Sequence, residues 1–462
     1  MTGAGRAARL IDSGRRIATL AWPVFVGQVA VLGFATVDTL FVARSGALDL
    51  AALAIGGAAY ISVFVGLMGI VLAVGPIAGQ LYGAKRYHEC GAQLHQAMWL
   101  ALFFAVPGCA LLLFPEPFFA LSHATPEVAG RARGYLAAIA FALPFALLFT
   151  AFRGFNTAVS RPKIVMSLQL GALVLKVPLN ALLVFGTPAL HIPALGAAGC
   201  GIATAICMAG QMVIAWVMLR RDPFYDRFGL RGAVHGPQRD SLMALLRLGL
   251  PMGGSIMVEV TGFTFMAFFI ARLGATPVAG HQIAINLVSL MFMMPLAIAN
   301  AASTLVAQRI GADDLRDARR IGWHGVEIAL LIALAMGGAV YLLRPAILRI
   351  YTDDAAVVAA ALPLLAWVAV FHVADAVQTT AAFVLRAWRI ATVPLVIYVL
   401  AIWGVGLGGG YTVAFDTFGH APPTLRGAQG FWSAATAGLV IAGCGMSLFL
   451  LWMLKQRRGE RA

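Results

Sequence analysis

The stretch FVARSGA (Phe41–Ala47) returns later in the chain as FIARLGA (Phe269–Ala275), with five of the seven positions identical. The second copy lies 228 residues after the first, and the same offset pairs Pro23 with Pro251. Self-similarity at a fixed spacing is the signature of an internal structural repeat. We therefore predict that the chain consists of two halves with similar folds.

Both halves are strongly apolar. The chain has 462 residues, of which 61% are hydrophobic and 11% charged, with a mean hydropathy of +0.88. A soluble domain is about half apolar and about a quarter charged. Apolar runs of about 20 residues, the length that a helix needs to cross a bilayer, recur along the chain. We predict an all-α polytopic membrane protein with twelve transmembrane helices, at residues 17–42, 51–80, 93–115, 130–154, 165–187, 194–219, 243–271, 279–308, 321–343, 356–385, 392–412 and 429–453.

Six predicted spans in each half bring the chain back to the side of the membrane on which it began. Both halves then share one orientation, and transporters use parallel repeats of this kind with a binding site between them. The most polar connection, RRDPFYDRFGLRGAVHGPQRD (Arg220–Asp240), falls between the halves. We predict two six-helix lobes related by a parallel repeat, residues 1–219 and 243–462, joined by a basic cytoplasmic linker at residues 220–242. The alternative is a repeat that serves packing alone.

The net charge of +14 comes largely from Lys and Arg at the two ends of the chain and in the even-numbered connections, including Arg386 and Arg389 after the tenth span. This distribution follows the positive-inside rule and predicts that both termini are cytoplasmic. It attributes the basic charge to topology rather than to a nucleic-acid partner. We expect a monomer in a bacterial-type cytoplasmic (inner) membrane, surrounded by the lipid bilayer.

Three carboxylates lie deep inside predicted spans, namely Asp38, Glu259 and Asp375. A charge at the bilayer centre costs about 2.5–3.5 kcal/mol on insertion scales, so such residues usually face a cavity or a partner and mark an ion or substrate path. Asp375 shares a helix face with His372 at i−3 and Gln378 at i+3. The alternative for this polar stripe is a hydrogen-bond cluster that only holds helices together. We predict that the three acids bind a cation or the substrate.

Further polar residues fall at helical spacing in the spans. Gln282 and Asn286 share one face in HQIAIN, and Lys176 and Asn180 share one in LVLKVPLN. A lysine this deep needs a partner, and Asp38 is the only deep acid of the first half. We predict a Lys176–Asp38 ion pair that keeps Asp38 ionised. The alternative is a lysine that extends its ammonium group to the membrane interface.

Several of these motifs together resemble a known family. They are WP…VDTLFV in the first span, P…VE in the seventh, HQIAIN in the eighth, and DAVQ followed by LRAW in the tenth. The chain resembles the multidrug and toxic compound extrusion (MATE) transporters of the NorM-like branch over essentially its whole length. The resemblance implies a secondary active multidrug efflux antiporter, not an enzyme, that exports cationic and amphipathic compounds in exchange for H⁺ or Na⁺.

On this resemblance Asp38 is the acid of the N-lobe, while Glu259 and Asp375 form the cation site of the C-lobe and are the candidate ligands if the ion is Na⁺. One departure from the family pattern is Lys176, which stands where relatives tend to have a neutral Asn. It implies that the N-lobe contributes less to ion coupling.

A second departure concerns the coupling ion. Phe371, one turn before Asp375, stands where NorM-like members can have Tyr, which removes an oxygen ligand for Na⁺. His372 beside it titrates near neutrality when it is unperturbed, so the sequence favours H⁺ over Na⁺. We expect no other cofactor. The alternative function is a lipid-linked precursor flippase of the same superfamily, whose cavity should carry cations for a pyrophosphate instead of three acids.

Overall fold

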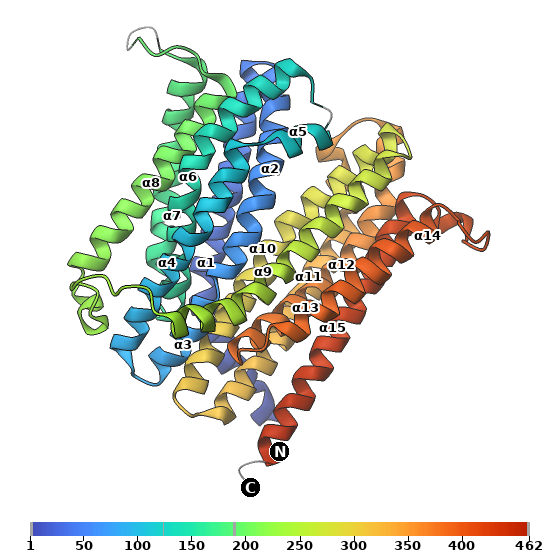
Figure 1. Cartoon of the computed structure of the whole chain (residues 1–462). Coiled ribbons are helices and arrows are strands. Elements are labelled where there is room, and N and C mark those ends of the chain that lie inside the picture. The colour runs from blue at the N-terminus through green and yellow to red at the C-terminus, as the bar shows by residue number, and fades with distance from the viewer. Residues whose placement is uncertain (1–2, 123, 188–190, 460–462) are drawn as a thin grey trace. The chain divides into compact units, whose positions relative to one another are not determined.

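The computed structural model describes residues 3–122, 124–187 and 191–459, and helices dominate these ranges (Figure 1). Twelve helices in the described part of the chain are long and apolar enough to cross a membrane, which confirms the predicted number. The first half contains α1 (Gly3–Ser45), α2 (Ala47–Val71) continued by α3 (Val74–Gly83), α4 (Tyr87–Leu113), α5 (Glu116–Ser122), α6 (Pro126–Ala158), α7 (Pro162–Phe185), α8 (Gly196–Arg221) and the 3-10 turn η2 (Pro223–Phe228).

The second half repeats this order with one irregular helix. It contains α9 (Arg239–Ala271), α10 (Ala275–Gly311), α11 (Leu315–Tyr351), α12 (Ala355–Ala387), α13 (Thr392–Tyr398), the π-helical segment η3 (Val399–Gly409), α14 (Gly410–Ala414), the 3-10 turn η4 (Pro423–Leu425) and α15 (Ala428–Gly459). Together α13, η3 and α14 make one membrane span, Thr392–Ala414.

The repeated heptapeptide forms the turn between the first two spans of each half. Gly46, at its sixth position, precedes α2 with φ 147°, and Gly274 precedes α10 at the same position with φ 109°. A residue with a Cβ rarely adopts these angles, whereas glycine does so readily. The two glycines thus occupy equivalent points between the first two helices of each half and let α2 and α10 begin at the next residue.

The chain packs into two compact units whose boundaries differ from the predicted lobes. One unit consists of Met1–Phe25 and Gly254–Ala462, and the other of Val26–Gly253. Helices α1 and α9 therefore each contribute residues to both units. Below, the unit that holds Gly254–Ala462 is the C-unit and the unit formed by Val26–Gly253 is the N-unit.

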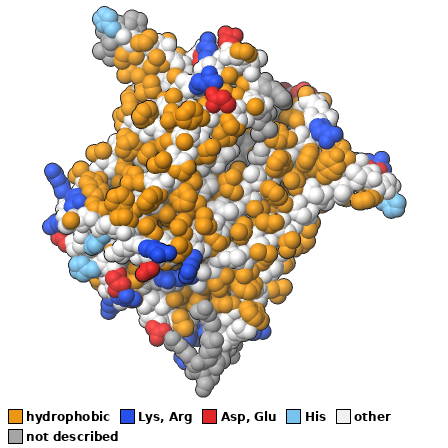
Figure 2. Space-filling view, viewed as in Figure 1, with side chains coloured by type: hydrophobic (Ala, Val, Ile, Leu, Met, Phe, Trp, Pro, Cys, Tyr) orange, Lys and Arg blue, Asp and Glu red, His pale blue; other side chains and the backbone are white. Residues whose placement is uncertain are grey.

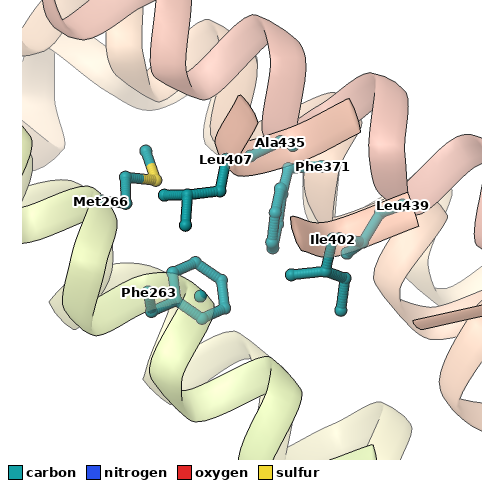
Figure 3. Close-up of a pocket in the computed structure, with 9 residues that line it drawn as sticks. Phe263, Met266, Phe371, Ile402, Leu407, Ala435 and Leu439 are labelled. Carbon is teal, nitrogen blue, oxygen red and sulfur yellow. The ribbon is translucent and has the colours of Figure 1, made fainter. Parts of the chain in front are cut away.

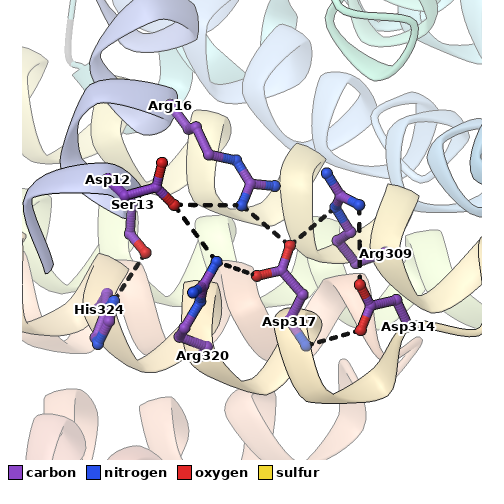
Figure 4. A network of polar contacts seen from close by, with 8 residues as sticks. All are labelled: Asp12, Ser13, Arg16, Arg309, Asp314, Asp317, Arg320 and His324. Atoms are coloured by element: carbon purple, nitrogen blue, oxygen red, sulfur yellow. Dashed lines mark hydrogen bonds and ion pairs between the residues drawn. The ribbon is translucent and has the colours of Figure 1, made fainter. Parts of the chain in front are cut away.

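Ion pairs explain why the start of α1 belongs to the C-unit (Figure 4). Asp317, near the start of α11, has a side chain only 12% exposed and lies within 3.0 Å of three guanidinium groups, those of Arg16, Arg309 and Arg320. Beside them, Ser13 Oγ of α1 lies 2.8 Å from His324 Nδ1 of α11. A buried carboxylate shared by three arginines is well compensated, so it can hold α1 against α11.

Hydrogen bonds attach the segment before α9 to the N-unit, as ion pairs attach the start of α1 to the C-unit. Gln96 of α4 is fully buried; its Nε2 donates to Gly236 O and its Oε1 accepts from the backbone N–H of Gln238, both at 2.8 Å. The indole N–H of Trp99 donates to His235 O at 2.9 Å. These bonds place most of the predicted linker, and the start of α9, in the N-unit.

The surface matches a multi-pass membrane protein. Figure 2 shows hydrophobic side chains over much of the visible surface of the helices, while charged side chains gather near helix ends and connections. Large apolar side chains such as Phe103, Phe141 and Leu342 are more than half exposed. Such residues are stable in hydrocarbon, where they face lipid tails instead of water.

Candidate functional site

The N-unit contains the predicted ion pair. Lys176 Nζ of α7 lies 2.9 Å from Asp38 Oδ1 of α1; the lysine side chain is fully buried and that of the aspartate is 13% exposed. Asn180 Nδ2, one turn further along α7, donates to the same carboxylate oxygen at 2.9 Å. The structure thus confirms the pair and the shared face of Lys176 and Asn180. The burial of Lys176 rules out the alternative of a lysine that reaches the interface.

Two residues that the sequence analysis missed complete the surroundings of Lys176. Its ammonium group donates to Thr204 Oγ1 of α8, whose own hydroxyl proton goes to Cys200 O at 3.0 Å. The ring of Phe34 lies on another side, with its centroid 4.8 Å from Nζ. A carboxylate, a hydroxyl and an aromatic face together compensate the buried ammonium group. The Lys176 ammonium group therefore has partners on α1 and α8 close by within the N-unit, Asp38 being its ion-pair partner.

The C-unit holds the second group, built around Asp375 of α12. Gln378 Nε2 donates to Asp375 Oδ1 at 2.9 Å and to Thr379 Oγ1 at 3.0 Å. The hydroxyl of Tyr398, which lies just before the π-helical segment, donates to Gln378 Oε1. All four side chains are buried. The predicted stripe is thus confirmed for Asp375 and Gln378, while Tyr398 comes from another helix and had no sequence signal.

Glu259 of α9 belongs to the same group. It lies within electrostatic range of Asp375 and of Arg386, and Tyr398 is within range of all three. One turn beyond Glu259, the ring of Phe263 packs edge-on against Phe371, with centroids 5.7 Å apart. Because Phe371 is itself one turn from Asp375, this aromatic contact holds the acid-bearing segments of α9 and α12 side by side.

Arg386 corrects one sequence interpretation. The charge pattern predicts that Arg386 lies in a connection after the tenth span, but α12 continues to Ala387, and Arg386 is only 5% exposed. Its guanidinium carbon lies 4.4 Å from the centroid of the Phe383 ring on the same helix. No ion pair within 4.0 Å of Glu259 or Asp375 is found in the part of the chain that the structure describes. The C-unit group therefore contains two carboxylates and one buried guanidinium at longer range.

The remaining predicted residues lie apart from these contacts. His372 is buried, and neither of its ring nitrogens has a hydrogen-bond partner among the described residues, Asp375 included. Gln282 and Asn286 are exposed, and Asn286 Oδ1 accepts a hydrogen bond from Tyr351 at 2.7 Å. The structure does not bring Gln282 or Asn286 into contact with the acids of the C-unit.

A small cavity lies between α9, α12, η3 and α15 (Figure 3). Its volume is about 20 Å³, and all of its lining is apolar: Gly262, Phe263, Met266, Phe371, Ile402, Gly406, Leu407, Ala435 and Leu439. A cavity of this size has room for about one water molecule. Its lining side chains offer no carboxylate, amide or hydroxyl oxygen to a cation, and neither Glu259 nor Asp375 is among the residues that line it.

Burial makes the charge of these acids costly. A carboxylate in a low-dielectric surrounding is expensive unless a proton, a metal ion or a protein cation neutralises it. Lys176 lies at ion-pair distance from Asp38. Among the residues that the structure describes, no basic side chain forms an ion pair with Asp375, so the two acids differ in how their charge is compensated.

Known proteins resemble this chain over nearly its full length. The family model described as MatE matches residues 23–182 and 251–412. A probable multidrug resistance protein NorM of Aromatoleum aromaticum is 39% identical over 442 residues, which cover 94% of this chain and 92% of that protein. The multidrug resistance protein NorM of Vibrio cholerae is 34% identical, with 95% of each chain covered.

Solved structures share the fold. A eukaryotic MATE transporter, AtDTX14, superimposes with a TM-score of 0.86 at 18% identity and covers 98% of this chain and 99% of its own. The Vibrio cholerae MATE transporter VcmN in the bent form gives a TM-score of 0.85 at 17% identity, with 97% and 98% covered. These matches support the all-helical architecture that the sequence predicted.

Proposed function

The chain belongs to the MatE family, and we propose that it is a secondary active antiporter that exports cationic, amphipathic drugs in exchange for H⁺. The resemblance in the sequence motifs is thereby confirmed at the level of the family. The names of the NorM relatives support multidrug export as the activity. We propose in addition that the protein acts as a monomer in a bacterial inner membrane, with both termini in the cytoplasm.

The observation that carries the proposal is the buried network of Asp375, Gln378, Thr379 and Tyr398 beside Glu259. With both acids ionised and Arg386 charged, this group has one net negative charge. Binding of one monovalent cation makes it neutral. A proton that enters from outside and a cationic drug that leaves can then use the group alternately, which is the condition for antiport.

The orientation of Gln378 favours a proton over Na⁺. Its amide N–H points at Asp375 Oδ1, while its carbonyl oxygen already accepts the Tyr398 hydroxyl. An N–H donor next to the carboxylate repels a metal ion, and Phe371 one turn away adds no oxygen. Hard cations need several oxygen ligands, whereas a proton needs one carboxylate oxygen.

Direct transport measurements test the proposal. Purified protein in liposomes should export a fluorescent cationic dye when a proton gradient is imposed without Na⁺. Dye export that requires a Na⁺ gradient, and that persists after the proton gradient is collapsed, would contradict H⁺ coupling. Absence of dye export under either gradient, together with translocation of a lipid-linked pyrophosphate, would instead support the flippase alternative.

A further inference from the structure

A second and larger hollow lies in the C-unit; Ala374, next to Asp375 in α12, lines it, but the acids themselves do not. It is an open groove of about 470 Å³ between α11, α12 and α15. Its lining residues are Leu334, Gly337, Gly338, Tyr341, Ala369, Val370, Val373, Ala374, Val377, Val440, Gly443 and Cys444. Clefts that bind small molecules in proteins have volumes of about 300–1,000 Å³ and mostly apolar walls. The groove thus has the size and the lining of a ligand site.

Glycines create the groove by bringing the helices close together at its floor. A Cβ atom on Gly337 would lie only 2.6 Å from Ala369 O, and one on Gly443 would lie 3.5 Å from Ala374 O. Gly338, in contrast, has no atom within 4 Å of its Cβ position. The absence of a side chain at Gly338 therefore leaves empty space that opens toward the lipid-facing surface.

One end of the groove carries a fixed positive charge. Tyr341 lines the groove, and the Arg344 guanidinium carbon lies 4.0 Å from the centroid of its ring. Arg344 Nη1 also donates to Tyr341 O at 2.6 Å, so the guanidinium group is held in place. Tyrosine and arginine near the end of a membrane span are typical of the headgroup region of a bilayer. The site thus joins an apolar trough to a basic end.

We propose that this groove binds one phospholipid, with an acyl chain along Gly338 and its phosphate at Arg344. The three helices that form it are all membrane spans, so lipid tails are the apolar molecules that reach it at the highest concentration. The charge of Arg344 complements a phosphate and gives anionic headgroups an advantage. The proposal concerns the lipid-facing surface and does not depend on which ion or drug is transported.

Native mass spectrometry of the purified full-length protein with added phosphatidylglycerol tests the proposal. Wild type should retain one phospholipid that resists detergent, and Gly338→Leu should lose it because the leucine fills the groove. Gly171→Leu on α7 is the matched control, since Gly171 is also exposed and has nothing within 4 Å of its Cβ position. Equal retention by the two variants would overturn the proposal, as would a wild-type dimer that Gly338→Leu dissociates without loss of lipid.

Two further measurements block the groove in protein that has already folded and compare the binding of two lipid headgroups. Cys444 is exposed and lines the groove, so alkylating it with N-cyclohexylmaleimide fills the site in protein that has already folded. Bound lipid should be lost on alkylation of wild type but kept in Cys444→Ala treated identically. Retention of lipid in both proteins would overturn the proposal.

Arg344→Gln should weaken phosphatidylglycerol binding about fivefold and phosphatidylcholine binding less, since one basic residue contributes about 1 kcal/mol toward anionic lipid. Unchanged binding of both lipids by Arg344→Gln would overturn the assignment of Arg344 to the phosphate, and equal weakening of both would overturn the advantage given to anionic headgroups.

Discussion

The two units place buried acids on equivalent scaffolds but neutralise them differently. In the N-unit, Asp38 meets the Lys176 ammonium group directly at 2.9 Å. In the C-unit, the hydrogen bonds to Asp375 from described residues come from the neutral side chains of Gln378 and Thr379, and the buried Arg386 acts on Glu259 at longer range. The repeat thus preserves the helices and the turns at Gly46 and Gly274, while the charge chemistry has diverged. We infer that the N-unit group stabilises its unit and that the C-unit group exchanges the cation.

The largest effect should follow from removing the exchangeable acids. Asp375→Asn and Glu259→Gln should each abolish gradient-driven dye efflux, because the C-unit group can then no longer alternate between charged and neutral forms. Efflux is measured in proteoliposomes at equal amounts of inserted protein. Thr264→Val, on α9 but bonded only to its own backbone, serves as a control and should retain activity. Normal efflux by either acid variant would show that the replaced C-unit acid is not needed for cation exchange.

The second effect concerns the pair in the N-unit. Lys176→Met or Asp38→Asn alone should destabilise the protein by about 3–5 kcal/mol, because each leaves one buried charge or its partners uncompensated. The double variant should recover part of this loss, and the coupling energy from the thermal unfolding of all four proteins is the test. If the double variant also keeps proton-driven efflux, the N-unit acid is confirmed as structural. If the two single losses of unfolding free energy simply add in the double variant, Lys176 and Asp38 do not interact. Asp38 would then again be a candidate for cation exchange.

These two groups also show what the sequence could reveal. Hydropathy predicted all twelve spans, and the need of a buried charge for a partner predicted the Lys176–Asp38 pair before any contact was known. Thr204 and Tyr398 could not be found in this way, because contacts between different helices leave no spacing in the sequence. The predicted tenth span ended at residue 385, whereas α12 ends at Ala387, so Arg386 lies in the last turn of the helix. Its burial could not be predicted, because it depends on contacts between helices that the charge pattern does not show.

The boundaries of the units illustrate the same limit. The polar stretch at residues 220–242 separates the two predicted lobes, but polarity alone does not say what a segment packs against. Ser13 and Arg16 bind α11, while Gly236 and Gln238 bind Gln96 of α4. These contacts join segments far apart in the chain, so only the folded structure shows that the first helix of each half contributes to both units.

A smaller effect is expected at Arg386. Replacing it with glutamine removes a buried positive charge near Glu259, which changes the charge balance of the exchanging group. The pH profile of dye efflux should therefore shift by about one unit. Arg386→Lys keeps the charge and is the control. An unchanged profile for Arg386→Gln, at normal expression, would show that Arg386 does not act on the exchanging group.

The smallest effect is expected for a more exposed ion pair in the same unit, which serves as a reference for the buried Lys176–Asp38 pair. Outside the membrane spans, Arg161 Nη1 lies 2.6 Å from Asp222 Oδ2, and both side chains are about 30% exposed. Partial burial opposes ionisation of Asp222, but the Phe224 N–H and the Arg161 guanidinium outweigh it and hold the pKa of this carboxyl below its usual value. Since the folded pKa of Asp222 is below the unfolded value of about 3.9, the stabilisation is present above that pH and is lost as pH falls through the folded pKa.

Asp222→Asn should therefore lower the free energy of unfolding by only about 0.2–1 kcal/mol at pH 7 and should leave it unchanged near pH 2. Thermal unfolding at both pH values measures this difference. If Asp222→Asn lowers the free energy of unfolding at pH 7 as much as Asp38→Asn does, burial does not distinguish the two ion pairs. The buried Lys176–Asp38 pair then does not stabilise the N-unit more than an exposed pair does.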